Sequence, residues 1–380
     1  MLELKKRRKM KEYKDLNTSP RILLGPGPSM VHPRVLRAMA HPLIGHLDPQ
    51  FVNLMNEVQD LLRYVYETKN EITFPISGTG SAGMDAVVGN FVEPGDPVLV
   101  CVNGYFGERL CEMVRRYGGD LSRLDKNWGD AFEPEELAIA LKTKSAKIVM
   151  IVMAETSTGV LQPLEEITKI VHENGALLLV DCVTSLGGMP VTIDKLGIDI
   201  AYSGTQKCLG CPPGLSPITI NNLAREKLHT RKSQIPSWYL DISLIESYWG
   251  KERTYHHTAP ITMNYALRES LRLIQEEGLE KRYIRHKENA EFFWDCLEEI
   301  DLKPVVNYKY RLPSLTTIMV PEGIDASEVC SRLLNEYNIE IAGGLGALKG
   351  KVWRVGLMGF SSSKENILLL ISALTRILRN

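Results

Sequence analysis

The chain has 380 residues, with 45 basic and 46 acidic side chains and a formal net charge of −1. Hydrophobic residues make up 44% and charged residues 24%, which is the balance of a soluble globular protein and excludes a disordered, collagen-like or coiled-coil chain. Near-zero net charge argues against nucleic-acid binding, and no run of about 18 apolar residues is present to span a membrane. At roughly 150 residues per domain, the length predicts two or three domains.

The cysteines and the first residues indicate a reducing compartment. There are seven cysteines, an odd number, and no secretory signal precedes them, so we expect free thiols in the cytoplasm. Cys208 and Cys211 form a C-x-x-C, but no second pair completes a zinc site, so we expect no metal. Whether they form a redox pair stays open. Residues 1–20 are predicted to form an extended arm that lies across a partner subunit.

Residues 23–265 alternate short apolar strands with helices. Residues 23–29 alternate prolines with glycines and cannot be helical. Strands are expected over 72–76, 97–102, 148–153 and 176–180, and helices over 51–66, 82–91, 108–117 and 164–174. This alternation predicts βαβ units and a mostly parallel sheet that is buried on both faces.

After about residue 266 the pattern changes to that of a smaller α+β unit. Charged residues recur at helical spacing over 266–300, and the expected elements are strands at 314–320 and 352–357 and helices at 325–337 and from 364 onward. We therefore divide the chain into an arm (1–20), a large domain (21–270) and a small C-terminal domain (271–380).

A glycine-rich loop at residues 78–83, Gly-Thr-Gly-Ser-Ala-Gly, matches the G-x-G-x-x-G pattern of dinucleotide sites. The next acids, Glu93 and Asp96, lie in a Pro-Gly turn rather than at the end of a second strand, which argues against a dinucleotide. The Ser and Thr hydroxyls favour a terminal phosphate monoester instead. A helix N-terminus attracts anions through free N–H groups, so the loop predicts a phosphate without identifying the cofactor.

Two residues farther along the chain complete a chemical pattern. Asp181 follows the apolar strand 176–180, at the strand end where open α/β sheets bind ligands. Lys207 lies among small residues after another apolar stretch, and partial burial lowers the pKa of such an amine, as a Schiff-base nucleophile requires. A phosphate loop, an acid and a lysine together fit pyridoxal 5′-phosphate, which carries a phosphate, an aldehyde and a pyridine nitrogen.

Eight stretches of the chain resemble the class V aminotransferases of the fold-type I pyridoxal-phosphate family, in particular the alanine–glyoxylate and serine–pyruvate aminotransferases. They are LLGPGPS (23–29), SGTGSAGMDA (77–86), NGYFGER (103–109), AETSTGVLQPL (154–164), LLLVDCVTSLGG (177–188), YSGTQKCLGCPPG (202–214), YHHTAP (255–260) and GKVWRVGLMG (350–359). The resemblance implies an α/β fold, with a mostly parallel seven-stranded sheet covered by helices and a smaller α+β C-terminal domain.

The resemblance also implies residue roles. Lys207 would carry the cofactor as a Schiff base, Asp181 would keep the pyridine nitrogen protonated, and Phe106 would stack on the ring where mammalian relatives commonly have Trp. Arg354 would pair with the substrate α-carboxylate. The other implied contacts are Thr79, Gly80, Ser81 and Gln206 at the phosphate, Thr156 and Val183 along the cofactor pocket, Gly27 on the substrate side, and Tyr255 and Thr258 reaching the phosphate from the neighbouring subunit.

The implied activity is ping-pong transamination in a homodimer with shared active sites, from alanine or serine to glyoxylate or pyruvate. Ser81 stands where mammalian relatives carry His, which leaves the substrate preference open. One alternative is another class V reaction, such as phosphonate transamination or cysteine desulfuration; a desulfurase needs a thiol on a mobile loop, whereas Cys296 and Cys330 lie in helical patterns. An NAD-dependent oxidoreductase or a non-catalytic binding protein are further alternatives.

Overall fold

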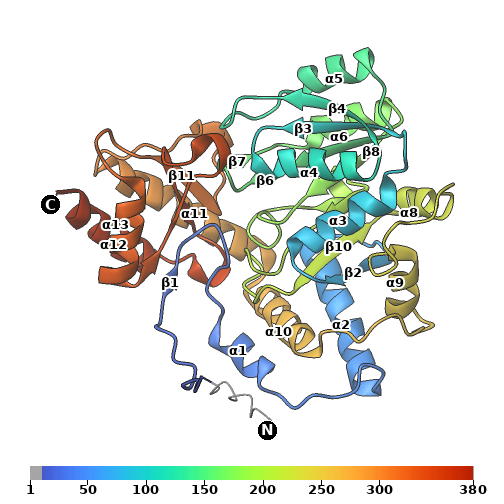
Figure 1. The fold of residues 1–380 in the computed structure, drawn as a ribbon, viewed down its shortest axis with the longest axis horizontal. Coiled ribbons are helices and arrows are strands. Elements are labelled where there is room, and N and C mark those ends of the chain that lie inside the picture. The colour runs from blue at the N-terminus through green and yellow to red at the C-terminus, as the bar shows by residue number, and fades with distance from the viewer. Residues whose placement is uncertain (1–10, 380) are drawn as a thin grey trace, which may run out of the picture.

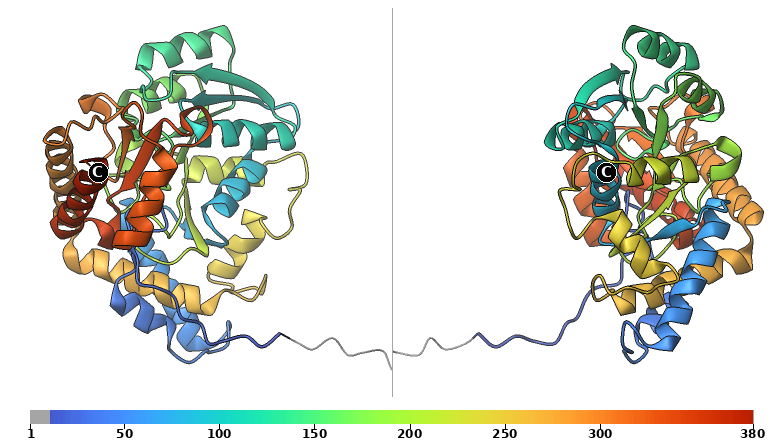
Figure 2. Two further views of the ribbon diagram at one scale, coloured as in Figure 1. Left: turned by 60° about the vertical axis from the view of Figure 1, so that its left-hand side comes forward. Right: turned by 90° about the vertical axis from the view of Figure 1, so that its right-hand side faces the viewer.

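The computed structural model describes residues 11–379, which form a large and a small domain side by side (Figure 1). The arm expected over 1–20 lies partly outside the described residues. Residues 11–20 are exposed and have no regular structure, and Figure 2 shows them running away from both domains. Whether they contact a partner subunit stays a prediction.

The large domain is built on a seven-stranded sheet, as the family resemblance implies. In spatial order the strands are β2 (Ile72–Ser77), β10 (Leu215–Ile220), β9 (Ile200–Tyr202), β8 (Leu177–Asp181), β5 (Ile148–Val152), β3 (Pro97–Val102) and β4 (Asp120–Asp125). All neighbours pair in parallel except β10, which is antiparallel to both β2 and β9. The central strands are continuous apolar runs because helices cover both faces of the sheet.

Helices of the large domain follow the expected periodicity, with shifted ends. They are α1 (Pro33–Met39), α2 (Pro49–Tyr66), α3 (Gly80–Phe91), α4 (Tyr105–Arg116), α5 (Pro134–Thr143), α6 (Glu165–Glu173), α7 (Ile193–Leu196), α8 (Asn222–His229), α9 (Ile242–Trp249) and α10 (Ile261–Glu277). Asp48 starts α2 by accepting a hydrogen bond from Gln50 N–H, with Pro49 in the first turn. Helix α4 begins at Tyr105, one turn earlier than its apolar pattern predicts.

The small domain packs three helices against a short sheet. The helices are α11 (Leu279–Glu298), α12 (Ala326–Tyr337) and α13 (Lys364–Arg379), and the sheet joins β11 (Leu315–Met319), β14 (Val352–Gly356) and β13 (Ala342–Gly343). Near the other end of the chain, β1 (Ile22–Leu23) pairs in parallel with β12 (Ile339–Glu340), and Leu24 belongs to the apolar core of the small domain. The segment that enters the large domain therefore first crosses the small one.

The predicted domain boundary at residue 270 falls inside helix α10, whose Leu271 and Ile274 belong to the apolar core of the large domain. The exact boundary stays a prediction. No helix within residues 11–379 combines the length and the apolar character that crossing a membrane requires.

Candidate active site

Asp181 is the last residue of β8, at the carboxyl edge of the sheet, and its side chain is only 3% exposed. One carboxylate oxygen accepts from the backbone N–H of Val183 at 2.8 Å and the other accepts from the Tyr202 hydroxyl at 2.5 Å. Burial raises the pKa of Asp181 to about 6, although both hydrogen bonds favour the ionised form. The structure therefore fixes a buried acid in one orientation, and a cationic group placed against this carboxylate would favour its ionised form.

Lys207 lies in the turn after β9 and is 8% exposed. The loop at residues 26–29 holds it: Ser29 donates to the Lys207 carbonyl at 2.8 Å, and the ammonium group donates to the Pro26 carbonyl. Burial, together with the nearby positive charge of Arg354, lowers the pKa of Lys207 to about 8. An amine with this pKa is partly neutral near pH 7, as attack on an aldehyde requires.

Arg354 comes from β14 of the small domain and is 6% exposed. Its guanidinium donates to the Gly343 carbonyl at 2.8 Å and to the Thr156 carbonyl at 3.3 Å, and no acidic side chain within residues 11–379 forms an ion pair with it. Burial lowers the pKa of Arg354 to about 10, which still leaves it protonated at neutral pH. A buried, unneutralised guanidinium is a receptor for a carboxylate, which it can bind in a bidentate fork.

The expected phosphate loop opens helix α3. Thr79 occupies the N-cap position without a side-chain capping bond, and within the described residues no acceptor contacts the N–H groups of Gly80 and Ser81. The Oε1 atom of Gln206 is buried and has no partner there either. Unpaired N–H groups at a helix N-terminus favour an anion, so this donor set fits a phosphate.

Small residues keep the space beside this loop open. A Cβ placed on Gly204 would lie 3.3 Å from the Cα of Gly80 and 2.8 Å from Gln206 Oε1. A Cβ on Gly80 would contact Val183 at 3.5 Å, so Val183 borders the same loop. The close backbone approach and the unpaired donors both match the phosphate end of pyridoxal 5′-phosphate, and the residues present fit this cofactor.

Glu155 is a site residue that the sequence analysis missed. It is fully buried at the end of the short strand β6 (Ala154–Glu155) and accepts from Phe106 N–H at 3.1 Å and from the Ser157 hydroxyl at 2.7 Å. A Cβ on Gly104 would lie 2.3 Å from its Cγ, so α4 begins directly against this carboxylate. Glu155 therefore holds the first turn of α4, which carries Phe106. The signal available in the sequence was a lone acid in the otherwise uncharged stretch 148–163.

Burial raises the pKa of Glu155, while hydrogen bonds from Ser157 and from the backbone of Phe106 and Gly107 lower it. Thr156, the next residue, is buried and gives its carbonyl to Arg354. One short segment therefore positions both the expected ring-stacking residue and the expected substrate arginine.

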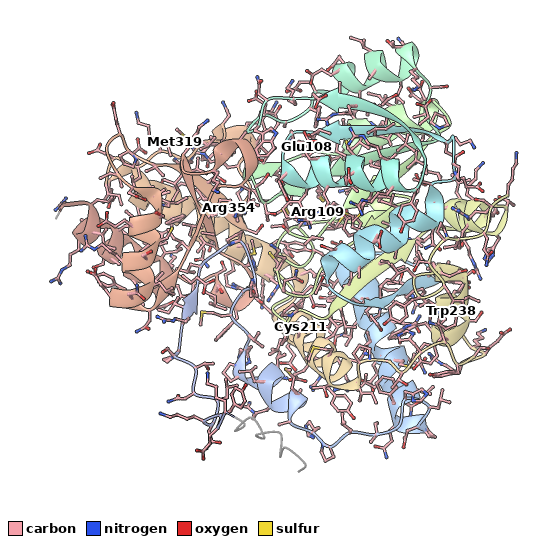
Figure 3. All side chains as sticks on the ribbon, viewed as in Figure 1. Glu108, Arg109, Cys211, Trp238, Met319 and Arg354 are labelled. Carbon is pink, nitrogen blue, oxygen red and sulfur yellow. The ribbon has the colours of Figure 1, made fainter. Side chains whose placement is uncertain are left out.

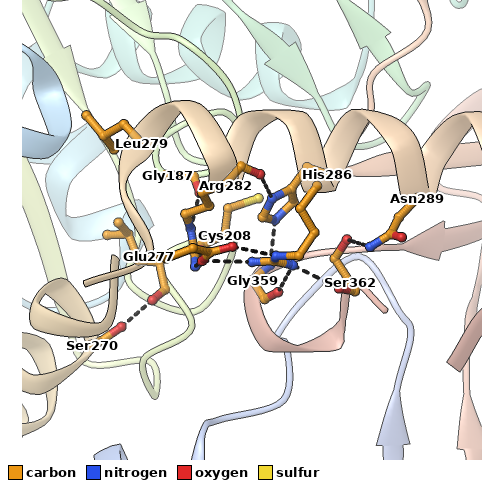
Figure 4. Close-up of polar contacts among 12 residues, drawn as sticks. Gly187, Cys208, Ser270, Glu277, Leu279, Arg282, His286, Asn289, Gly359 and Ser362 are labelled. Atoms are coloured by element: carbon orange, nitrogen blue, oxygen red, sulfur yellow. Dashed lines mark hydrogen bonds and ion pairs between the residues drawn. The ribbon is translucent and has the colours of Figure 1, made fainter. Parts of the chain in front are cut away.

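A polar network joins the small domain to the segment that follows Lys207 (Figure 4). The buried Arg282 of α11 donates to the carbonyls of Gly187 and Cys208, each at 2.7 Å, and pairs with Glu277 at 2.6 Å. His286, also on α11, accepts from Gly359 N–H at 3.0 Å, and burial lowers its pKa to about 3. The network fixes the backbone at Cys208 relative to the small domain, which supplies Arg354.

Tyr255 and Thr258 are not brought to this chain's own phosphate loop by any hydrogen bond within the described residues. Tyr255 is 58% exposed, and its ring packs 5.2 Å from that of His46. The intervening His257 does reach the end of β2, where its Nε2 lies 2.6 Å from Ser77 Oγ. His257 therefore lies beside the phosphate loop, whereas the side chains of Tyr255 and Thr258 are exposed. Cys208 and Cys211 are buried free thiols.

This fold, with a buried lysine, a strand-end acid, a phosphate loop and an unneutralised arginine, defines a fold-type I pyridoxal-phosphate transaminase. A profile of the family Aminotransferase class-V matches residues 22–368, and the chain belongs to that family. The expected family, fold, transaminase activity and cofactor are therefore confirmed, and the dehydrogenase interpretation of the glycine loop is wrong. The roles of individual residues stay predictions, which the geometry above supports.

Three relatives show how much of the chain is shared. It is 42% identical to the alanine–glyoxylate aminotransferase of Rattus norvegicus, over 93% of this chain and 86% of that protein. It is 39% identical to the (S)-ureidoglycine–glyoxylate transaminase of Bacillus subtilis, over 97% and 93%. The crystal structure of the alanine–glyoxylate aminotransferase from Nostoc sp. superposes with a TM-score of 0.96 at 54% identity, over 97% of this chain and 98% of that one.

Proposed function

We propose that this enzyme moves the amino group of a small amino acid, alanine or serine, to glyoxylate or pyruvate. The carrying observation is that a buried Lys207 and a buried, unneutralised Arg354 are near enough for the charge of Arg354 to lower the pKa of Lys207, so the site offers an amine and a carboxylate receptor together. Relatives named for glyoxylate transamination, similar over nearly the whole chain, support glyoxylate as an acceptor.

When bound, pyridoxal 5′-phosphate supplies an aldehyde that takes up the amino group and a ring that stabilises negative charge at the substrate's Cα. Asp181 would hold a proton at the pyridine nitrogen, because its buried carboxylate would gain a cationic partner there. The amine of Lys207 would act as the base that takes the proton from the substrate Cα, since its lowered pKa suits proton transfer near neutral pH. Arg354 orients the substrate by its α-carboxylate.

The experiment is a set of half-reactions followed by the absorbance of the bound cofactor. Alanine and serine should convert it to the amine form, and glyoxylate and pyruvate should convert it back. Lys207→Ala should abolish both conversions while the protein remains folded. If no amino acid changes the spectrum of the wild-type protein, the proposed function is wrong.

The desulfurase alternative finds no support in the placement of its thiols. Cys296 lies within helix α11 and Cys330 within helix α12, and neither is on a loop. Release of sulfide from free cysteine by the purified enzyme would contradict this reasoning.

We also propose that the active form is a homodimer in the cytoplasm. Exposed apolar side chains gather beside the segment 255–258, and such patches mark interfaces; they are Leu43, Leu47, Trp238, Tyr239 and Tyr255. Trp238 stacks on His256 with the ring centres 4.4 Å apart, and Tyr239 meets His257 edge-on at 5.3 Å, so both rings lie against this segment. The seven free cysteines support a reducing compartment, which cell fractionation would test.

Mixing two inactive variants tests whether sites are shared. Lys207→Ala lacks the amine, and the double variant Tyr255→Ala/Thr258→Ala lacks the expected contacts to the partner's phosphate. Mixed dimers contain one site with both sets intact, so activity should reappear after co-refolding. If the mixture stays inactive although sedimentation shows mixed dimers, the shared-site arrangement is wrong.

A further inference from the structure

Arg109 is a cation at the active site to which neither the sequence analysis nor the family resemblance assigns a role. It lies on α4 one turn beyond Phe106, and its Nη1 donates to the Ser81 hydroxyl at 3.0 Å. In Figure 3, Arg109 lies near α3 and α4, with Arg354 opposite it on the small domain. Arg109 therefore contacts the first turn of α3, where the phosphate site begins.

The positive charge of Arg109 has no acidic partner within residues 11–379. Its neighbour in sequence, Glu108, pairs instead with Arg123 at 2.7 Å. The guanidinium lies 5.0 Å from the centre of the Phe106 ring and 5.4 Å from that of Tyr105, an arrangement that favours a cation over the aromatic faces. The side chain is therefore held in place by rings and a hydroxyl while its charge stays unneutralised.

The groups at the start of α3, which Arg109 contacts through Ser81, suit an anion. The N–H groups of Gly80 and Ser81 have no acceptor within the described residues, and the N-terminal end of α3 adds a positive dipole. A phosphate dianion placed here would receive N–H donors and the Ser81 hydroxyl, yet these groups carry no full positive charge. Arginine is the residue that supplies such charge with several donors to a phosphate.

We propose that Arg109 is a cofactor-binding residue that neutralises the phosphate group at the N-terminus of α3. The proposal rests on the pyridoxal 5′-phosphate site described above and adds a ligand from this chain's own α4. The proposal also gives Ser81 a role at this position. Its small side chain leaves room for the Arg109 guanidinium, and its Oγ accepts a hydrogen bond from that group. Arg109 then joins the phosphate loop to the helix turn that carries Phe106.

Two probes separate this role from a merely structural one. The full-length apoprotein is titrated with pyridoxal 5′-phosphate and with pyridoxal, which lacks the phosphate. Arg109→Gln should weaken the binding of pyridoxal 5′-phosphate by about tenfold to hundredfold, the range of a charge-assisted hydrogen bond, and leave pyridoxal binding unchanged. Arg109→Lys should restore part of the loss because it keeps the charge without the fork.

The matched control is Arg116→Gln on the same helix, since Arg116 is 75% exposed and pairs with Glu112. It should change neither affinity, and thermal unfolding of each apoprotein checks that the variants fold. If Arg109→Gln weakened the binding of pyridoxal 5′-phosphate and of pyridoxal equally, the proposal would be overturned, and Arg109 would instead support the position of Phe106. Unchanged cofactor affinity with weakened amino-acid binding would overturn it in favour of substrate recognition. If the wild-type protein bound pyridoxal but gained nothing from the phosphate, the phosphate site itself would be wrong.

Discussion

Gly27 lies directly against the side chain of Lys207. A Cβ at position 27 would come within 2.7 Å of Lys207 Cδ and 2.8 Å of its Nζ, and Gly27 has a φ of +115°, which side-chain-bearing residues rarely adopt. The Lys207 side chain thus occupies the space that a larger residue at position 27 would fill. The loop at residues 26–29 also belongs to the segment that crosses from the small domain.

Gly27→Ala should displace the amine and lower kcat by about a hundredfold, since misplacing a reacting group by an ångström has effects of that size. The added methyl should also destabilise the fold by about 1 kcal/mol because of the positive φ. Gly175→Ala is the control: its φ is +70°, and a Cβ there would meet nothing within 4 Å. Urea unfolding should show a loss of stability in both variants, larger in Gly27→Ala, and steady-state kinetics should show lost activity only in Gly27→Ala. Equal activity losses would contradict the steric argument.

The pH dependence of cofactor uptake should follow Lys207. Only the neutral amine attacks an aldehyde, and the pKa of Lys207 is about 8, so the uptake rate should rise with pH around that value. Arg354→Gln removes a positive charge that lowers this pKa, so the midpoint should move to higher pH. Stopped-flow absorbance from pH 6 to 10 measures both, with Arg116→Gln as the unshifted control. A midpoint that moves down in Arg354→Gln would contradict the electrostatic assignment.

The apoprotein should carry a stability signature of Asp181. Its pKa is about 6 when folded, against an ordinary value of 3.8, so the folded state binds the proton more tightly. The bound proton therefore stabilises the folded state fully below the ordinary pKa of 3.8, and this stabilisation is lost as pH rises through the folded pKa of about 6. Relative to Asp181→Asn, the wild-type free energy of unfolding should fall by at most about 3 kcal/mol between pH 4 and 7, at about 1.4 kcal/mol per pKa unit. Urea unfolding of both proteins across this range measures the difference; a constant gap would show that Asp181 does not titrate there.

Arg354→Lys should impair substrates that carry an α-carboxylate. Lysine keeps the charge but cannot form two parallel hydrogen bonds, so kcat/KM for alanine should fall by about tenfold to hundredfold. Ethylamine, which is alanine without its carboxylate, should react at an unchanged rate, measured by single-turnover absorbance. Equal losses with both amines would mean that Arg354 supports the structure of the site rather than the substrate.

Glu155→Gln should destabilise the protein. The amide would turn an NH₂ group toward the N–H and hydroxyl donors of Phe106 and Ser157, so the free energy of unfolding should fall by about 1–3 kcal/mol. Cofactor affinity should fall as well, because the turn carrying Phe106 loses its anchor. Glu112→Gln, on the exposed face of α4, is the control and should be neutral. A fully stable Glu155→Gln protein would show that this carboxylate does not hold α4.

The structure contains strands that local patterns do not reveal. Strand β4 is an edge strand whose sequence, Asp-Leu-Ser-Arg-Leu-Asp, is mostly polar because one side meets solvent, so it lacks an apolar run. Strand β10 is buried throughout but contains Pro217 and runs antiparallel to its neighbours, which a βαβ reading does not predict. In contrast, β3 and β5 are continuous apolar runs, and their positions follow from the sequence within a residue.

The sequence by itself determined the elements with strong local periodicity and the chemical identity of the site, because Lys207, Asp181 and the loop at 78–83 each lie beside a recognisable strand or turn. Only the tertiary structure decided which groups are buried and which of them form hydrogen bonds or ion pairs with one another. Arg354 meets the Thr156 carbonyl across 198 positions, Glu155 is buried under the start of α4, and Arg109 forms no ion pair with an acid of residues 11–379. Burial and pairing are set by segments distant along the chain, and those same two quantities control the pKa and the ligand preference of every charged group in the site.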